Sequence, residues 1–202
     1  MATDPRVRIG HCSPDAPTVD VHVDEEPAFQ NLAFGDMSDF ASLSAGRHEV
    51  AIAPAGEREA VLEKHIRLQD ETTYTVLATG MLEDLEATVF EDEPGDVPDD
   101  KSHVRFIHAS PDAPSVTISV RDGPDIFERI RFRRSSTYEA VDAGTYDLDV
   151  HPAGEEDVVL GLDGIELAGG SAYTVVAIGQ VSDDSLDTMI LEEEPVALAA
   201  DD

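Results

Sequence analysis

Two short segments carry histidine, serine and aspartate, the residue types of a hydrolytic triad. HCSPDAP occupies residues 11–17 and HASPDAP occupies residues 108–114. A triad hydrolase needs an activated nucleophile, a base and a group that orients the base. Cys12 is replaced by Ala109 in the second copy, and Ser13 precedes a proline with no Gly-x-Ser-x-Gly elbow around it. We therefore predict no catalytic residue and a protein that is not an enzyme.

Each segment also has the composition of a structural corner between two strands. Proline presets a turn and an extended exit from it, and an aspartate in a turn accepts hydrogen bonds from nearby backbone N–H groups. His11 is in phase with Val7 and Ile9, so we expect it to be buried and to pair with Asp15. The alternative is a ligand site at this end of the domain. Both interpretations concern His11, Ser13, Asp15, His108, Ser110 and Asp112.

A cluster of arginines in ERIRFRRSS, residues 128–136, is the second group with binding chemistry. Guanidinium groups present planar donor forks that suit carboxylates. If the segment is one strand, alternate arginines share a face. Two interpretations stay open: pairing with acidic strands of the same chain, or a docking edge for a protein partner or a second copy. The residues are Arg129, Arg131, Arg133 and Arg134.

The sequence predicts no cofactor and no metal site. Asp20, His22 and Asp24 alternate along one strand, but three such positions span about 13 Å. One ion bound at about 2.1 Å from each ligand cannot bridge that span. No Gly-rich phosphate loop, C-x-x-C or H-E-x-x-H motif is present. We expect only weakly bound solvent cations at the acidic surface.

The net charge is strongly negative along the whole chain. There are 44 acidic and 13 basic residues, a formal net charge of -31. Binding to nucleic acid requires clustered basic residues, so nucleic acid is excluded as a partner. Self-repulsion opposes folding at low salt, whereas at molar salt the screening length is only about 3 Å. The imbalance resembles that of proteins from extreme halophiles, so we expect a haloarchaeal source and adaptation to high salt.

Targeting signals are not apparent. No apolar run approaches the about 20 residues of a membrane span, and the sequence MATDPRVRIG lacks the basic and apolar regions of a signal peptide. We therefore predict a cytoplasmic protein without membrane insertion. The alternative is an exported or cell-surface protein from which a leader was removed.

The chain contains two copies of one unit. VRIGHCSPDAPTVDVHV at 7–23 matches VRFIHASPDAPSVTISV at 104–120, and YTVLATG at 74–80 matches YTVVAIG at 173–179. Apolar residues alternate with polar ones, which is typical of half-solvated antiparallel strands. Turn residues separate these short segments, so we predict an all-β protein of two tandem immunoglobulin-like antiparallel β-sandwich domains. The expected boundaries are a first repeat at 1–94, an acidic proline-containing linker at 95–102, a second repeat at 103–195 and an acidic tail at 196–202.

Three motifs carry a family resemblance. The H-x-S-P-D-A-P corner, the A-G-x-[HY]-x-[VL]-x-[VI]-x-P-A-G segment and the Y-T-V strand resemble the hallmarks of a prokaryotic family of unknown function, DUF 4397. The resemblance covers nearly the whole chain, once per repeat, and implies a β-sandwich, an exported or envelope location and no assigned activity. We expect a non-enzymatic protein that acts by protein–protein or cell-surface interaction. The alternative is a small-ligand or carbohydrate-binding module that uses the loops near the two corners.

Overall fold

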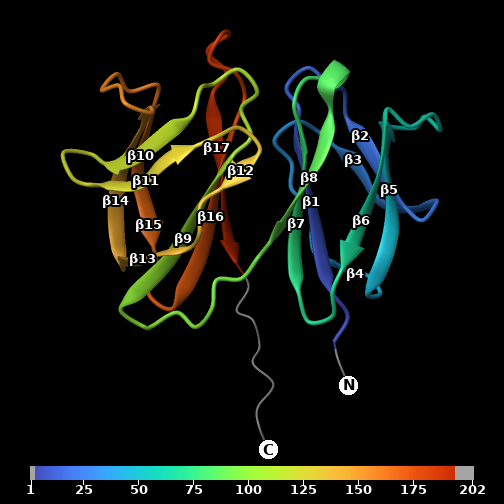
Figure 1. Cartoon of the computed structure of the whole chain (residues 1–202), viewed down its shortest axis with the longest axis horizontal. Helices are drawn as coiled ribbons and strands as arrows, with labels where there is room; N and C mark the ends of the chain where they lie inside the picture. Colours follow the sequence, from blue (N-terminus) through green and yellow to red (C-terminus); the bar gives the residue numbers. More distant parts are fainter. Residues whose placement is uncertain (1–2, 194–202) are drawn as a thin grey trace, which may run out of the picture. The chain divides into compact units, whose positions relative to one another are not determined.

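The chain folds into two compact units built from strands. The computed structural model describes residues 3–193 (Figure 1). One unit consists mainly of residues 3–93 and the other mainly of residues 94–193. The expected tail at 196–202 lies outside the described residues. Each unit contains most of one repeat, although residues 109–112 and 178–185 of the second repeat are grouped with the first unit. The two copies are described in turn.

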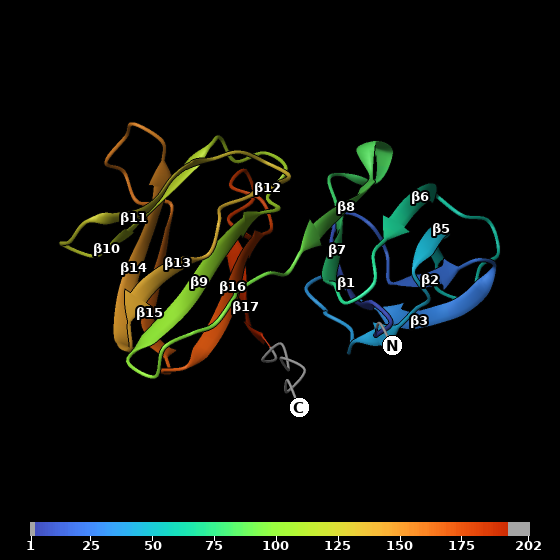
Figure 2. The ribbon, with the colours of Figure 1, turned by 60° about the horizontal axis from the view of Figure 1, so that its bottom comes forward.

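The first repeat is a sandwich of two four-stranded sheets. One sheet has the order β4 (Ala41–Ser42), β1 (Arg6–Cys12), β7 (Thr73–Thr79), β8 (Glu86–Glu91). The other, visible on the right of Figure 2, has the order β3 (Glu26–Leu32), β2 (Val19–Val23), β5 (Gly46–Pro54), β6 (Leu62–Leu68). A short 3-10 turn, η1 (Leu82–Asp84), lies between β7 and β8.

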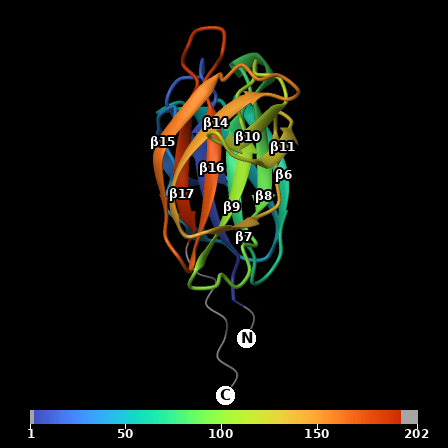
Figure 3. The same ribbon diagram turned by 90° about the vertical axis from the view of Figure 1, so that its left-hand side faces the viewer.

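The second repeat has the same plan. Figure 3 shows it from the side of the sheet that contains β14 and β15. One sheet has the order β12 (Arg134–Ser135), β9 (Lys101–His108), β16 (Ser171–Ile178), β17 (Asp187–Glu193), and β13 (Glu139–Asp142) also pairs with β9. The other has the order β11 (Asp125–Ile130), β10 (Val116–Val120), β14 (Gly144–Pro152), β15 (Leu160–Leu167). Because β9 begins at Lys101, the last two residues of the segment expected as a linker are strand.

The predicted all-β tandem sandwich is confirmed, with one parallel pairing in each repeat. β1 runs parallel to β7, from Arg6 opposite Thr73 to Cys12 opposite Thr79. β9 and β16 repeat this arrangement. Both β7 and β16 lie inside their sheets, as expected from side chains that are apolar or threonine on both faces. The other pairs whose register is described are antiparallel.

Every second side chain along the strands points into the space between the two sheets and fills it. In the first repeat this core includes Val7, Ile9, Val21, Ile52 and Val76. The equivalent core of the second repeat includes Val104, Phe106, Ile118, Val150 and Val175. Burying such aliphatic and aromatic side chains contributes about 1.5–3 kcal/mol each, which makes the two cores the main source of stability.

The outer face of β1 is not solvated, contrary to our expectation. Arg8 is only 4% exposed, and its guanidinium carbon lies 4.8 Å from the centre of the Phe40 ring. Met37 covers the neighbouring Gly10, where a Cβ would lie 2.6 Å from the Met37 methyl carbon. The segment between β3 and β4 therefore folds over this face, and a side chain at position 10 would displace the ends of the Met37 and Leu77 side chains.

Candidate functional site

The histidine of the first corner is buried and held by its own backbone. His11 is 1% exposed. Its Nε2 lies 3.0 Å from the carbonyl oxygen of Pro17, and the Ser13 N–H donates to Nδ1 over 3.3 Å. Nε2 therefore carries the proton and Nδ1 accepts, which is the neutral tautomer. Burial lowers the pKa of His11, and this effect outweighs the opposing hydrogen bond to Pro17.

Asp15 does not pair with His11, so that expectation was wrong. Its Oδ1 accepts a hydrogen bond from the Leu82 N–H at 2.8 Å, and the Ser13 hydroxyl donates to the same oxygen at 3.4 Å. The turn directs this carboxylate outward to the β7–β8 connection, while the histidine ring points into the sandwich. The corner therefore ties β1 to two different segments through two different side chains.

The second corner repeats the arrangement. His108 is fully buried, and its Nε2 lies 2.9 Å from the carbonyl oxygen of Pro114. Burial lowers the pKa of His108 against the opposing backbone hydrogen bonds. Asp112 accepts hydrogen bonds from the N–H groups of Val181 and Ser182, each at 2.9 Å. Ser110 is buried, as Ser13 is.

The arginine segment is not one strand, because its backbone turns. β11 ends at Ile130, and Arg134 begins β12. Arg129 and Arg133 have positive φ values of 56° and 59°, and this left-handed conformation breaks a regular strand. The expected common face of alternate arginines is therefore absent. Arg133 instead stacks on Phe132, with 4.7 Å from its guanidinium carbon to the ring centre.

The other three arginines of the segment are exposed. Within residues 3–193, no ion pair is present at Arg129, Arg131 or Arg134. Three arginines of the first repeat are equally exposed and unpaired within the same range, but they are scattered: Arg47, Arg58 and Arg67. The distinguishing feature of the second repeat is thus the concentration of exposed guanidinium groups at one end of β11.

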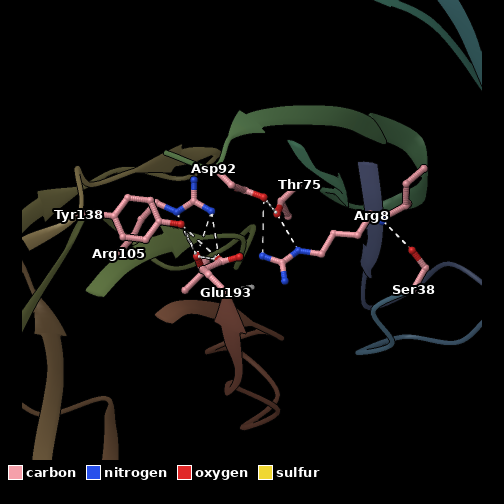
Figure 4. A network of polar contacts seen from close by, with 9 residues as sticks. Arg8, Ser38, Thr75, Asp92, Arg105, Tyr138 and Glu193 are labelled. Atoms are coloured by element: carbon pink, nitrogen blue, oxygen red, sulfur yellow. Dashed lines mark hydrogen bonds and ion pairs between the residues drawn. The ribbon is translucent and has the colours of Figure 1, made fainter. Parts of the chain in front are cut away.

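Sequence reasoning missed a buried polar cluster in the first repeat (Figure 4). The Arg8 Nε donates to the Thr75 hydroxyl at 2.9 Å, and that hydroxyl donates to Asp92 Oδ2 at 2.7 Å. Arg8 and Asp92 also form an ion pair at 3.8 Å. Each of the three side chains is at least 95% buried. A buried charge is tolerated only when paired and hydrogen-bonded, so this cluster satisfies its own charges.

The second repeat contains the same cluster. Arg105 donates to the Thr174 hydroxyl, which in turn hydrogen-bonds Glu193, and the ion pair between Arg105 and Glu193 measures 3.7 Å. Tyr138 covers the guanidinium group at 4.8 Å, as Phe40 does in the first repeat. The arginine was visible in the paired motifs VRIG and VRFI. The burial of this arginine could not be predicted from the motifs, because it depends on the aromatic residue that covers the guanidinium group.

A groove lies on the outer face of β10 and β14 in the second repeat. Its volume is about 710 Å³. A chain of hydrogen bonds crosses its floor, because the Ser119 hydroxyl lies 2.6 Å from Asp125 Oδ1 and 2.8 Å from His151 Nε2. His151 Nδ1 is buried and has no hydrogen-bond partner within residues 3–193. Arg129 and Gly154 also line the groove.

Two further findings concern the part of the chain that is described. No group of three or more histidine, cysteine, aspartate or glutamate side chains between residues 3 and 193 is arranged to hold a metal ion. No helix within that range is long and apolar enough to cross a membrane.

Comparison with known proteins gives one family and several distant structures, two of which are named below. The family described as "Domain of unknown function (DUF4397)" matches residues 5–119 and 119–202. No curated protein matches the sequence. A family CBM26 module of Eubacterium rectale Amy13K, solved with maltoheptaose, covers 94% of this chain and 98% of its own at 9% identity and a TM-score of 0.31. A "putative cell adhesion protein" of Bacteroides fragilis covers 96% and 98% at 7% identity and a TM-score of 0.22. Similarity at this level carries no argument about function.

Proposed function

The chain belongs to the DUF4397 family, and we propose that it is a non-enzymatic binding protein that docks carboxylate groups of a protein partner on its second repeat. The docking residues in this proposal are Arg129, Arg131 and Arg134, and the chain is adapted to high salt. One observation carries the proposal: three exposed arginines occur within six residues of the sequence and none of them forms an ion pair within residues 3–193, in a chain with a net charge of -31.

High salt makes this docking physically reasonable. At low ionic strength the net charge of -31 would repel an acidic partner. At molar salt the screening length is about 3 Å, so distant carboxylates contribute little. A guanidinium fork in direct contact with a carboxylate keeps its paired hydrogen bonds. At molar salt, the hydrogen bonds between a guanidinium group and a carboxylate in direct contact therefore outweigh the repulsion that arises from the net charge.

The test uses a fluorescein-labelled peptide of ten glutamates and the full chain in KCl solutions that keep it folded. The triple variant Arg129→Gln/Arg131→Gln/Arg134→Gln should bind the peptide at least tenfold more weakly than the wild type in fluorescence anisotropy. The matched control Arg47→Gln/Arg58→Gln/Arg67→Gln changes the net charge equally and should bind within twofold of the wild type. If both triple variants lost the same amount of peptide binding, the loss would result from the change in net charge alone. That outcome would contradict the proposal.

A second copy of the chain is the other partner that this surface could accept. Sedimentation equilibrium of the same three proteins distinguishes it. Self-association that is lost only in the triple variant of the second repeat identifies the partner as another copy. If neither peptide binding nor self-association depends on the cluster, the docking role is wrong.

We further propose that the two corners are structural rather than ligand sites. The burial of His11 and His108 and their bonds to the carbonyl oxygens of Pro17 and Pro114 support this role. Titration with neutral oligosaccharides should therefore leave the ring proton signals of both histidines unchanged in NMR spectra. A saturable shift of either ring would favour the ligand-binding alternative.

A further inference from the structure

In the first repeat, one aspartate closes the outer face of the sheet. Asp20 on β2 accepts a hydrogen bond from the Asn31 N–H at 2.8 Å and from the Gly56 N–H at 2.9 Å. These N–H groups belong to the bulge of β3 and to the turn after β5. The two backbone bonds lower the pKa of Asp20, so the carboxylate is the form that they hold.

The second repeat keeps both donors but lacks the carboxylate. The aligned strands VDVHV and VTISV place Thr117 where Asp20 stands. Arg129 occupies the bulge of β11 with a φ of 56°, against 57° for Asn31. Arg129 takes no part in the pairing register, which passes from Ile130 to Phe127.

The turn after β14 is also retained. Gly154 has a φ of 91° and Gly56 has a φ of 81°. Within residues 3–193 no acceptor is present for the Gly154 N–H, whereas the neighbouring Ala153 and Glu155 N–H groups bond to Ser115 and Pro152. The carboxylate that would join these two segments is therefore missing, and the groove of about 710 Å³ lies at that place.

We propose that this groove is a binding site for a small zwitterionic ligand, a cationic amino acid, whose carboxylate takes the place that Asp20 fills in the first repeat. The Arg129 and Gly154 N–H groups receive the carboxylate in this proposal, and Arg129, Gly154 and Thr117 all line the groove. The volume is in the range of about 300–1,000 Å³ that is usual for small-ligand sites.

The acidic residues that line the groove indicate that the ligand also carries a positive charge. Carboxylates surround the groove, which repels a simple anion and attracts an ammonium group. They belong to Asp122, Asp125, Glu128, Asp149, Glu155 and Glu156. Asp149 already pairs with Arg121 at 2.9 Å, so the other five are the ones available to a cation.

His151 adds an acceptor. Because the Ser119 hydroxyl donates to Asp125, it must accept from Nε2–H of His151, which leaves Nδ1 with a free lone pair. A buried acceptor without a partner is destabilising by about 1–3 kcal/mol. An ammonium group of the ligand that reaches this nitrogen removes that penalty, which favours a ligand with both charges.

The test is a titration of the 15N-labelled full chain with L-lysine, acetate and 1,5-diaminopentane, followed by NMR. L-lysine should shift the Arg129 and Gly154 amide signals saturably and at a concentration at least tenfold lower than acetate, and the diamine should leave both amides unchanged. No saturable shift with L-lysine would overturn the proposal. Equal affinity for acetate and L-lysine would overturn the zwitterionic class.

Two exchange variants provide the matched control. Thr117→Asp installs the carboxylate of the first repeat, so it should abolish the L-lysine shifts while the chain stays folded. Asp20→Thr removes that carboxylate and frees the same two N–H donors, so acetate should shift the Asn31 and Gly56 amide signals in this variant and not in the wild type. Wild-type lysine binding in Thr117→Asp would contradict the site. Thr117→Asp leaves all three docking arginines in place. Its effect on L-lysine binding therefore tests the groove independently of the proposed docking role.

Discussion

Both ring nitrogens of His48 face oxygen acceptors: Nδ1 lies 2.6 Å from Asp24 Oδ2 and Nε2 lies 2.7 Å from the carbonyl oxygen of Ser44. Only the protonated ring can donate to both. Burial lowers the pKa of His48, but the bonds to Asp24 and Ser44 outweigh it and raise the pKa overall. The second repeat has the neutral Tyr146 here, whose hydroxyl donates to the carbonyl oxygen of Asp142 at 2.8 Å.

The first repeat should therefore lose stability as the pH rises through the raised pKa of His48. The contribution is complete below the unfolded-state value of about 6.5 and disappears above the folded-state value. The N–H of Glu49 and then the His48 bond lower the pKa of Asp24, so acid removes its charge only well below that range. His65 Nε2 and Glu49 Oε2 lie 3.7 Å apart and form a further histidine–carboxylate contact between β5 and β6.

His48→Tyr copies the second repeat and should abolish this loss. Urea unfolding of the full chain between pH 6 and 9, together with NMR titration of the His48 ring, measures the effect. The variant and the wild type should differ most at pH 6 and least at pH 9. The same pH dependence in both proteins would show that another group is responsible.

His11 and His108 should have the opposite effect to His48: they should make the folded chain less stable as the pH falls. Burial lowers the pKa of His11 and of His108, so the unfolded chain binds more protons below about pH 6.5 and stability falls with acid. Each histidine contributes at most about 1.4 kcal/mol per pH unit. His11→Gln/His108→Gln should reduce the slope of the unfolding free energy between pH 6.5 and 5. An unchanged slope would rule out the buried neutral histidines as its cause.

Removing the central hydroxyl of either arginine cluster should be destabilising. Thr75→Val and Thr174→Val each leave a buried guanidinium group and a buried carboxylate with one partner fewer, at about 1–3 kcal/mol. Thr145→Val on the exposed face of β14 is the matched control, expected within about 0.5 kcal/mol of the wild type. Urea denaturation measures all three. If the three variants are equally stable, the clusters contribute nothing.

Cys12 should be chemically inert in the folded chain. Its side chain is fully buried, and burial raises the pKa of the thiol to about 12. The thiolate is the reactive form, so a chromogenic disulfide reagent at pH 8 should label it only when the first repeat opens. Labelling should become fast in denaturing urea and stay slow in the native state. Rapid labelling without urea would show that β1 is exposed in solution.

The thermal midpoint should fall when KCl is diluted below molar concentrations. A net charge of -31 on 202 residues makes self-repulsion a large opposing effect once screening is removed. Differential scanning calorimetry from 0.2 to 3 M KCl measures it, with sucrose as a control for solute effects that do not involve charge. A midpoint independent of KCl would contradict adaptation to high salt.

The internal repeat and the period-two pattern were sufficient to predict the sandwich, because alternation determines which side of a strand faces the core. They did not predict that Arg8 is buried, since its cover comes from Phe40 and its partner Thr75 lies 67 residues away. The groove had a sequence signal, the change from Asp20 to Thr117. That signal acquires meaning only when the structure places the Asn31 and Gly56 N–H groups on Asp20.

The parallel pairing of β1 with β7 also governs how the chain must assemble. β1 is synthesised first, yet its neighbour follows after most of the repeat, and such long-range pairing is slow to form. The two central strands carry closely similar sequences, YTVLATG and YTVVAIG, so each has the pattern that β1 pairs with. Exchange of these strands between repeats, or between chains, is the characteristic misfolding hazard of tandem copies.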